Sequence, residues 1–329
     1  MLITQTPLRI SFAGGGTDFA DFYTKEPGYV LSTAIDKYVY VIVKERFDDK
    51  IYINYTKKEI VDRVEKIQHD LVREALKRAG LFEGVEITTL ADVPSEGSGL
   101  GSSSSLTVGL LNAFYMYQGE QRTAEELARE ACEIEIEIVG KPIGKQDQYI
   151  AAYGNLRAFS FLPGGHVEIG KVPIPNGQKR DLDANTLLFF TNLTRKSETI
   201  LSQQRANIQD RMEVLHKIAM LGLEAKGALW EGDLDRIGTI LNRGWHLKKD
   251  LANPITNREI DGMYERALEA GALGGKISGA GGGGFLMLYC PPERQGAVRR
   301  ALQGYRELPF HFERDGSKVI FNMRRYEWK

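Results

Sequence analysis

A segment of glycine and serine, Gly97–Ser105, constrains this chain more than any other part of the sequence. The apolar stretch Val85–Leu90 before it predicts a strand, and the helical spacing of Leu106, Leu110 and Phe114 after it predicts a helix. Free backbone N–H groups and the positive end of a helix dipole meet at such a junction, and both favour phosphate oxygens. Hydroxyl groups in the first helical turn can also ligate Mg²⁺. The segment therefore predicts a phosphate-binding loop.

Two alternatives fit this segment less well. It is not a Walker A loop, because no Gly-Lys-Ser/Thr follows the glycines. A flexible Gly/Ser linker is also disfavoured, since linkers seldom lie tightly between an apolar strand and a helix with an apolar face.

Two more glycine clusters, Gly14–Gly16 and Gly279–Gly284, stand out among the 35 glycines of the chain. Arg9 and Asp18 lie at the two ends of the motif that contains the first cluster. The other cluster formally contains Gly-x-Gly-x-x-Gly, but it follows a predicted helix and precedes a predicted strand. A dinucleotide-binding fold needs the reverse order, so a Rossmann dehydrogenase is disfavoured. Taken alone, this last cluster predicts a structural turn as readily as a ligand loop.

The charge balance argues against two classes of partner. Lys and Arg number 43 and Asp and Glu number 44, so the net charge of −1 offers no basic field for nucleic acid or a membrane surface. The N-terminus does not resemble a signal peptide, and no apolar run approaches membrane-spanning length. Cys132 and Cys290 are predicted to be buried free thiols in a reducing compartment. We therefore expect a cytoplasmic protein, and its oligomeric state stays open.

The predicted elements indicate an α+β protein in two parts with a cleft between them. The polar stretch Pro173–Asp183 is the candidate domain boundary. Thr123 and Glu126 predict a capping box at the start of a helix. The other predicted helices are Val61–Ala79, Ser197–Leu229, Leu234–Leu251 and Glu259–Ala270. The other predicted strands are Leu8–Phe12, Tyr38–Val43, Ile51–Ile53, Leu156–Phe161, Val167–Val172, Leu187–Thr191, Phe285–Tyr289, Pro309–Glu313 and Val319–Met323.

Glu135 is the carboxylate that helical geometry selects from three on the capped helix. At about 100° per residue, Glu135 lies near the edge of the apolar face. Glu133 points away from that face, and Glu137 borders its other side. Glu135 is thus expected to reach inward while staying hydrated; the alternative is a solvated helix face. The apolar face is formed by Leu127, Ala131, Ile134 and Ile138.

Three motifs, in this order, resemble those of the GHMP kinases. Pro7–Asp18 is similar to the N-terminal motif of that family, and Lys276–Gly284 to its C-terminal glycine motif. Pro94–Ser103 resembles the Pro-x-x-x-Gly-Leu-Gly-Ser-Ser signature, with one extra residue before the glycines. The resemblance implies a two-domain α+β fold with the active site in the cleft and with ATP and Mg²⁺ as cofactors. The implied domains are an N-terminal domain like ribosomal protein S5 domain 2 (residues 1–178) and a ferredoxin-like C-terminal domain (residues 179–329).

The resemblance also implies roles for individual residues. Asp147, in a segment similar to the family's Gly-x-x-Asp loop, would be the general base, with Arg9 near the reacting oxygen. Ser103 and Glu135 would hold Mg²⁺. The ATP phosphates would be bound by Gly97, Ser98, Gly99, Leu100, Gly101, Ser102, Ser103 and Ser104. The substrate would be bound by Gly15, Gly16, Thr17, Asp18, Gly281 and Gly282.

The acceptor is narrowed by the first glycine cluster. Galactokinases carry Gly-Glu-His-Thr-Asp-Tyr where this chain has Gly14–Phe19, so Thr17 and Asp18 are retained while two glycines leave room for a bulkier sugar. Together with Gln146–Tyr149, this variant most resembles kinases of D-glycero-D-manno-heptose 7-phosphate, which act on the anomeric hydroxyl. Kinases of L-fucose are the alternative. A phosphorylated acceptor needs a cationic pocket, for which Arg195 is the best candidate; Lys196 is its neighbour, and a solvated turn capped by Ser197 is the competing interpretation.

Two other classes remain possible on the same scaffold. A diphosphate decarboxylase is disfavoured by the sugar-type Thr17-Asp18 pair. A non-catalytic sensor of ATP and sugar is disfavoured by the complete set of Ser103, Glu135 and Asp147.

Overall fold

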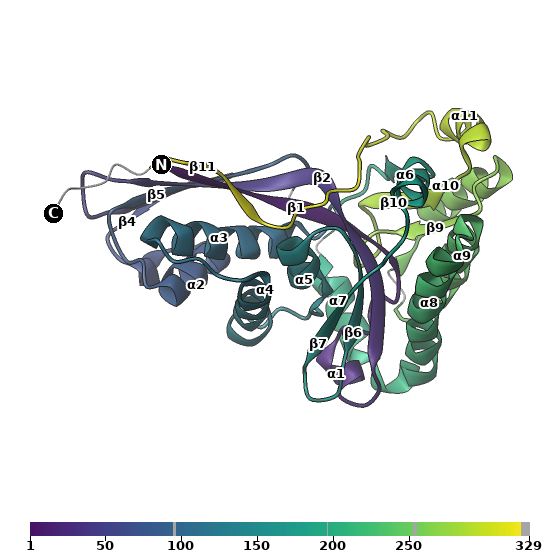
Figure 1. Ribbon diagram of the computed structural model, residues 1–329, viewed down its shortest axis with the longest axis horizontal. Coiled ribbons are helices and arrows are strands. Elements are labelled where there is room, and N and C mark those ends of the chain that lie inside the picture. The colour runs from purple at the N-terminus through teal and green to yellow at the C-terminus, as the bar shows by residue number, and fades with distance from the viewer. Residues whose placement is uncertain (95–96, 196, 253–254, 324–329) are drawn as a thin grey trace.

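The computed structural model describes residues 1–323 except 95–96, 196 and 253–254. Figure 1 shows two parts side by side: a long sheet with helices on one face, and a smaller sheet with several long helices around it. The predicted mixture of helices and strands in two parts is confirmed.

The larger sheet is built around two long strands, β1 (Leu2–Ala13) and β2 (Gly28–Glu45). Within the described residues it has eight strands in the order β11-β1-β2-β5-β3-β4, with β6 paired to β2 and β7. The first part of β2 pairs with β6 and the last part with β5, so the sheet changes direction along this strand. The other strands are β3 (Ile51–Asn54), β4 (Lys58–Val61), β5 (Val85–Ala91), β6 (Leu156–Phe161), β7 (Val167–Lys171) and β11 (Lys318–Asn322).

An irregularity in the pairing of β1 with β2 positions a functional side chain. The register shifts between Pro7 and Leu8, and Arg9 then pairs with Ala34. An irregularity of this kind re-aims the side chains that follow it. Arg9 is directed toward the helices rather than into the adjoining core.

One face of the larger sheet is covered by helices α2 to α5 (Figure 1). Their apolar side chains pack with those of the strands into one core, in which Val41, Ile53 and Phe114 are fully buried. The elements are α1 (Ala20–Tyr23), η1 (Val64–Lys66), α2 (Asp70–Ala79), α3 (Ser102–Gln118), α4 (Ala124–Cys132), the π-helix η2 (Glu133–Ile138) and α5 (Gln146–Tyr153).

The smaller sheet is antiparallel in the order β8-β10-β9. Its strands are β8 (Thr186–Phe190), β9 (Gly274–Ile277) and β10 (Phe285–Tyr289). The helices of this part are α6 (Asn176–Ala184), α7 (Ser197–Ala206), η3 (Gln209–Arg211), α8 (Met212–Glu231), α9 (Leu234–Lys249), α10 (Arg258–Glu269) and α11 (Pro292–Ala301).

A shared core joins the two parts. Leu8 and Leu31 of the larger sheet belong to the same buried cluster as Leu188 and Met287 of the smaller one. Helix α8 crosses β2 so closely that a Cβ on Gly222 would lie 2.4 Å from the carbonyl oxygen of Tyr29. The glycine therefore lets a helix of one part pack directly on the backbone of the other.

The local predictions succeed for most strands and fail where helices were drawn too long. The strands Leu156–Phe161 and Phe285–Tyr289 and the Thr123–Glu126 capping box are confirmed. The helix predicted over Val61–Ala79 is wrong in its first part, because residues 58–61 pair with β3 and only 70–79 are α-helical. The helix predicted over Ser197–Leu229 is wrong as one element, since η3 separates α7 from α8. The boundary stretch Pro173–Asp183 contains α6.

The end of the chain returns to the larger sheet. Strand β11 pairs with β1, although its residues fall in the range 179–329 predicted as the second domain. The strand predicted at Pro309–Glu313 is wrong: within that stretch a single bridge joins Phe312 to Ile35. The domain boundary between residues 178 and 179 remains a prediction. The chain after α11 returns to the larger sheet, which contains the residues assigned to the first domain.

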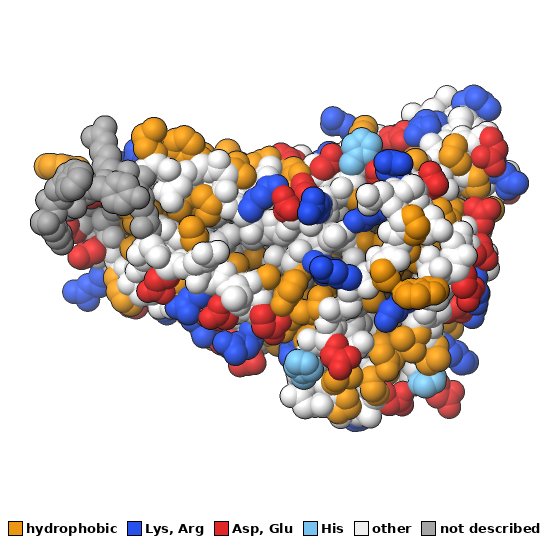
Figure 2. Space-filling model, viewed as in Figure 1, with side chains coloured by type: hydrophobic (Ala, Val, Ile, Leu, Met, Phe, Trp, Pro, Cys, Tyr) orange, Lys and Arg blue, Asp and Glu red, His pale blue; other side chains and the backbone are white. Residues whose placement is uncertain are grey.

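The face of the molecule shown in Figure 2 mixes acidic and basic side chains. Cys132 and Cys290 are buried and free, as predicted. In the part of the chain that the structure describes, every helix is too short or too polar to cross a membrane.

Candidate active site

The N-terminus of α3 presents unused backbone donors. Gly101 precedes the helix with a φ of +82°, and α3 has no side-chain cap. The first intrahelical bond runs from the N–H of Ser105 to the carbonyl of Gly101 at 2.9 Å. Because an α-helix leaves its first N–H groups without intrahelical partners, the amides of residues 102–104 are available to an anion.

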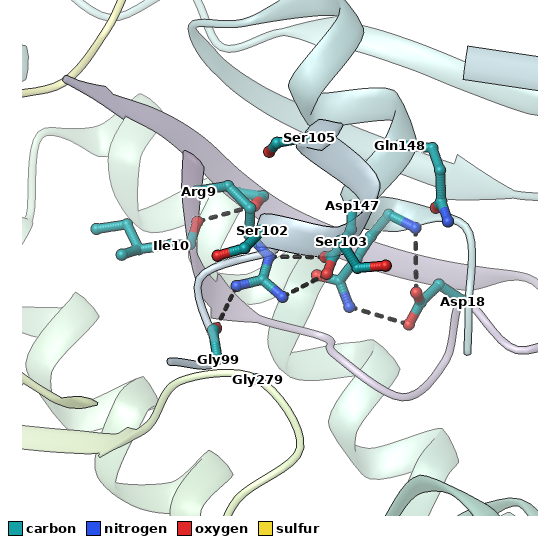
Figure 3. A network of polar contacts seen from close by, with 12 residues as sticks. Arg9, Ile10, Asp18, Gly99, Ser102, Ser103, Ser105, Asp147, Gln148 and Gly279 are labelled. Carbon is teal, nitrogen blue, oxygen red and sulfur yellow. Dashed lines mark hydrogen bonds and ion pairs between the residues drawn. The ribbon is translucent and has the colours of Figure 1, made fainter. Parts of the chain in front are cut away.

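The last glycine cluster packs against this loop, backbone to backbone. A Cβ on Gly99 would lie 2.3 Å from the carbonyl oxygen of Ser278, and one on Gly279 would lie 2.6 Å from the Cα of Gly99. A Cβ on Gly284 would lie 2.6 Å from the carbonyl oxygen of Ser98. Only glycine permits this approach, so this cluster supports the loop, and Figure 3 shows Gly279 directly beside Gly99.

Arg9 and Asp147 form a bidentate ion pair beside the loop (Figure 3). Arg9 donates from Nε to Asp147 Oδ1 and from Nη2 to Oδ2, both at 2.6 Å, and from Nη1 to the carbonyl of Gly99 at 2.5 Å. The Arg9 side chain is buried, whereas that of Asp147 keeps 23% of its surface exposed. A carboxylate oxygen has two lone pairs, so Asp147 can still accept a hydrogen bond from a ligand hydroxyl. The predicted pair is therefore brought together, with the carboxylate orientation fixed by the guanidinium.

A second polar cluster lies on the other side of the α3 N-terminus. Ser103 Oγ donates to Glu135 Oε1 at 2.5 Å, and Gln148 Nε2 donates to Glu135 Oε2 at 2.6 Å. Lys141 Nζ contacts both Ser103 Oγ at 2.7 Å and Glu135 Oε1 at 3.3 Å. The two residues predicted to hold a metal are thus in direct contact.

Glu135 differs from its prediction in one respect. Its side chain is fully buried, so the expectation that it stays hydrated is wrong, and Ile138, predicted on the apolar face, is 52% exposed. The cause is the π-helix over 133–138, which turns more slowly per residue than the α-helix assumed in the prediction. The change of phase rotates Glu135 into the interior and Ile138 out of it.

The first glycine cluster is held by internal hydrogen bonds. Asp18 is 2% exposed; its Oδ1 accepts from the N–H of Gly16 at 3.0 Å, and its Oδ2 accepts from the N–H of Gln146 at 3.1 Å. Burial raises the pKa of the Asp18 carboxyl, against the lowering effect of the Gln146 bond. Thr17 has no exposed surface, and its hydroxyl donates to the carbonyl of Gly14 at 2.8 Å. Both side chains thus shape the turn, and their contact with a substrate stays a prediction.

The two remaining glycines of the first cluster differ in the space around them. A Cβ on Gly15 would make only ordinary contacts, 3.6 Å from Gln146 Nε2 and 3.8 Å from Ser11 Oγ. A Cβ on Gly16 would lie 2.7 Å from Gln204 Nε2, so this position is filled by α7. A Cβ would therefore fit at Gly15 but not at Gly16, and the expected room for a bulkier acceptor stays a prediction.

The other predicted substrate residues lie near the loop. Gly281 and Gly282 pack on the backbone of Ile255, whose carbonyl accepts from the N–H of Gly282 at 2.7 Å. Arg195 is exposed, and its backbone adjoins Gly97. Lys196 lies outside the described residues.

Several polar groups around the site were missed by sequence reasoning. Lys248 Nζ donates to the carbonyls of Ile277 and Gly279, and burial together with Arg9 lowers its pKa to about 7. Lys276 is 8% exposed; burial, Lys248 and Arg9 lower its pKa well below the usual value. For Lys276, the sequence did offer a signal, because this lysine directly precedes the last glycine cluster. The sequence offered no such signal for Lys248, because this residue of α9 is brought to the glycine cluster only by the tertiary fold.

The oxygen donors present fit Mg²⁺. Magnesium prefers oxygen ligands and is usually held by one or two carboxylates together with substrate phosphates. Ser103 and Glu135 supply a hydroxyl and a carboxylate in contact. Among the described residues, no group of three or more His, Cys, Asp or Glu could hold a metal. A bound Mg²⁺ would complete its coordination with water or with the phosphate oxygens of a ligand.

Comparison with known proteins places this arrangement in a class. The models of the GHMP kinases N terminal domain and of the GHMP kinases C terminal match residues 55–155 and 225–307. The chain belongs to the GHMP kinase family, and the predicted family fold is confirmed.

Three of the similar proteins are named as kinases of a heptose phosphate or of fucose. The chain is 35% identical, over 96% of its length and 97% of the relative's, to a D-glycero-alpha-D-manno-heptose 7-phosphate kinase of Campylobacter jejuni. It superposes with a TM-score of 0.82 and 29% identity on the crystal structure of a D-glycero-D-manno-heptose 1-phosphate kinase from Bacteroides thetaiotaomicron, covering 98% of this chain and 100% of that one. It is 25% identical to a bifunctional fucokinase/GDP-fucose pyrophosphorylase of Arabidopsis thaliana, over 92% of this chain and 31% of that protein.

Proposed function

We propose that this protein is an ATP-dependent sugar kinase that phosphorylates the anomeric hydroxyl of D-glycero-D-manno-heptose 7-phosphate to give the 1,7-bisphosphate. The observation that carries the proposal is the convergence at the α3 N-terminus. The site of a Cβ on Gly101 is 3.4 Å from Asp147 Oδ2, and Ser103 is in contact with Glu135. Donors for phosphate oxygens, a partly exposed carboxylate and a pair of metal ligands thus surround one short loop.

Each group has a defined part in the proposed transfer. The amides of residues 102–104 bind phosphate oxygens of ATP. Ser103 and Glu135 would hold Mg²⁺, which would supply positive charge to the phosphate oxygens. Asp147 accepts the proton of the acceptor hydroxyl, whose oxygen bonds to the γ-phosphorus as the bond to the bridging oxygen of ADP breaks. Arg9 keeps the Asp147 carboxylate in place and puts a positive charge beside the reacting oxygen.

The choice of acceptor is supported by the relatives. The heptose 7-phosphate kinase of C. jejuni shares 35% identity over nearly the whole chain. L-Fucose is the second candidate, because the fucokinase relative matches 92% of the chain. Arg195 remains the proposed partner of the acceptor's own phosphate, as an exposed guanidinium beside the loop.

Release of ADP across a panel of acceptors tests the proposal. The panel comprises D-glycero-D-manno-heptose 7-phosphate, L-fucose, galactose and mevalonate, with ³¹P NMR of the product. We expect the largest kcat/KM with the heptose 7-phosphate and a new phosphate on the anomeric oxygen. A larger kcat/KM with unphosphorylated L-fucose would show that L-fucose, not the heptose 7-phosphate, is the acceptor. Tight ATP binding without ADP formation from any sugar would indicate a sensor, and release of CO₂ from a diphosphate would indicate a decarboxylase.

A further inference from the structure

Lys141 lies where a metal ion bound to Ser103 and Glu135 would lie. Its Nζ is 2.7 Å from Ser103 Oγ and 3.3 Å from Glu135 Oε1, the two atoms that are themselves 2.5 Å apart. A Mg²⁺ ion binds oxygen at about 2.1 Å, so an ion ligated by both atoms on the side that faces Nζ would occupy much of the volume of the ammonium group. The two cations also repel each other. Lys141 and Mg²⁺ would therefore compete for this pair of ligands.

The burial of Glu135 explains why a cation belongs there without metal. Its side chain has no exposed surface, and an isolated buried carboxylate is strongly unfavourable unless it is paired and hydrogen-bonded. Gln148 supplies one hydrogen bond to Oε2, and Lys141 supplies the compensating charge at Oε1. The ion pair thus balances the carboxylate before any ligand arrives.

The local backbone delivers Lys141 to this position, and part of its side chain reaches the surface. The Lys141 N–H donates to the carbonyl of Glu135 at 2.9 Å, and Gly140 before it adopts a φ of +78°, so the chain reverses directly after the π-helix. The Lys141 side chain keeps 15% of its surface exposed, while that of Glu135 has none. The flexible four-carbon stem of Lys141 therefore has a route to solvent, whereas the Glu135 carboxylate has none.

We propose that Lys141 is the resident cation of the Ser103–Glu135 pair and that Mg²⁺ binds there only by displacing it. The proposal rests on the proposed function, because that function assigns the metal to this pair. It gives Lys141 a role that the three family motifs did not indicate: the residue sets the affinity for metal by competing for its ligands.

Direct metal binding tests the competition without catalysis. Mn²⁺ is titrated into the nucleotide-free protein, and free Mn²⁺ is followed by electron paramagnetic resonance. Lys141→Met removes the competing charge but keeps most of the side-chain volume, so we expect Mn²⁺ to bind at least ~10-fold more tightly than in the wild type. Lys145→Met is the matched control, since Lys145 Nζ contacts the carbonyl of Gly165 instead of the pair. It reports the general effect of losing one nearby positive charge.

The outcomes separate this proposal from the proposed function. Unchanged or weaker Mn²⁺ binding by Lys141→Met, with binding lost in Glu135→Gln, would overturn the competition while leaving the metal site intact. Undiminished Mn²⁺ binding by Glu135→Gln would show that Ser103 and Glu135 do not hold the metal. That result would overturn both the competition with Lys141 and the metal assignment in the proposed function. A kinase panel without turnover would sink the proposed function but would not alter the binding result.

A measurement on the wild-type protein avoids any variant that folds poorly. Amine acylation is quantified by mass spectrometry for each lysine with and without Mg²⁺. Displacement predicts that the Lys141 acylation rate rises several-fold as metal saturates the site, with Lys145 as the internal reference. A Lys141 rate that stays constant while Mn²⁺ binds would contradict the proposal.

Discussion

Charged side chains reach this site from both parts of the molecule, but only those of the larger part are paired with a group of opposite charge. In the larger part, each carboxylate beside the loop has a cation: Arg9 pairs with Asp147, and Lys141 with Glu135. In the smaller part, Lys248 Nζ donates only to backbone carbonyls, and within the described residues the buried ammonium of Lys276 has no hydrogen-bonded or ion-paired partner.

The carboxylates of the larger part are charge-compensated by a cation of the protein, whereas the lysines of the smaller part need an anionic ligand for charge compensation. An ion pair fixes the orientation of its carboxylate at modest cost, because the charge is already compensated. A buried lysine without a carboxylate is destabilised in its charged form, which agrees with the lowered pKa of both lysines. An anion such as a phosphate would supply the missing charge. The larger part thus holds the chemistry in place, while the smaller part shapes the loop and favours an anion.

The largest effect is expected from the balanced pair. Asp147→Asn keeps the size of the side chain but removes its capacity to take a proton, so turnover should fall by at least ~10². ATP binding, measured by isothermal titration calorimetry, should stay nearly unchanged. Asp62→Asn, which alters an exposed carboxylate paired with Lys66, is the control. Near-normal turnover in Asp147→Asn would remove this residue from the role of base.

The contact between the two parts is tested at Gly99. Gly99→Ala forces a Cβ to 2.3 Å from the carbonyl of Ser278 at a φ of +72°, so we expect a loss of about 2 kcal/mol or more in the free energy of unfolding. Gly80→Ala has a similar φ of +69° and no atom within 4 Å, so it isolates the backbone strain, about 1 kcal/mol. Urea denaturation measures both. Equal losses would show that the backbone contact contributes nothing.

The support of Glu135 is tested at Gln148. Gln148→Leu leaves Glu135 Oε2 without its donor, so metal affinity should fall by ~10-fold. The Mg²⁺ concentration for half-maximal activity measures the change, and Gln118→Leu, on the exposed end of α3, is the control. An unaltered Mg²⁺ requirement would mean that burial alone orients the carboxylate.

The smallest effect, counted per pH unit, concerns the uncompensated lysine. With its pKa lowered from 10.5 to about 7, Lys248 is mostly neutral in the folded protein above pH 7 but protonated in the unfolded chain until about pH 10.5. The unfolded state then binds more protons, so the free energy of unfolding gains from Lys248 as pH rises between these values, by at most about 1.4 kcal/mol per pH unit.

Chemical denaturation at a series of pH values measures this dependence. Lys248→Met should flatten it, while Lys249→Met, which alters a lysine near Asp261, should preserve it. A wild-type slope that Lys248→Met leaves unchanged would show that this lysine is not held in its neutral form, and the contrast between the two parts would weaken.

Much of the site was predictable because short stretches of sequence specify it. The glycines at 97, 99 and 101 all adopt positive φ, and the serines after them begin α3, so one local pattern indicates both the loop and the helix start. Thr123 and Glu126 cap α4 by a contact that spans only three residues. Strands such as β6 and β10 were found at their observed limits, since their apolar runs are bounded by turn residues.

Other features depended on contacts between distant segments. The sequence alone determined a glycine-rich loop before a helix, an α+β composition and a carboxylate on the capped helix, because each follows from local backbone preference and periodicity. Only the tertiary structure decided that Glu135 is fully buried, that Lys141 occupies its vicinity, and that β11 returns to pair with β1. A π-helix changes the phase of side chains, and residues far apart in the chain meet only after the backbone has folded.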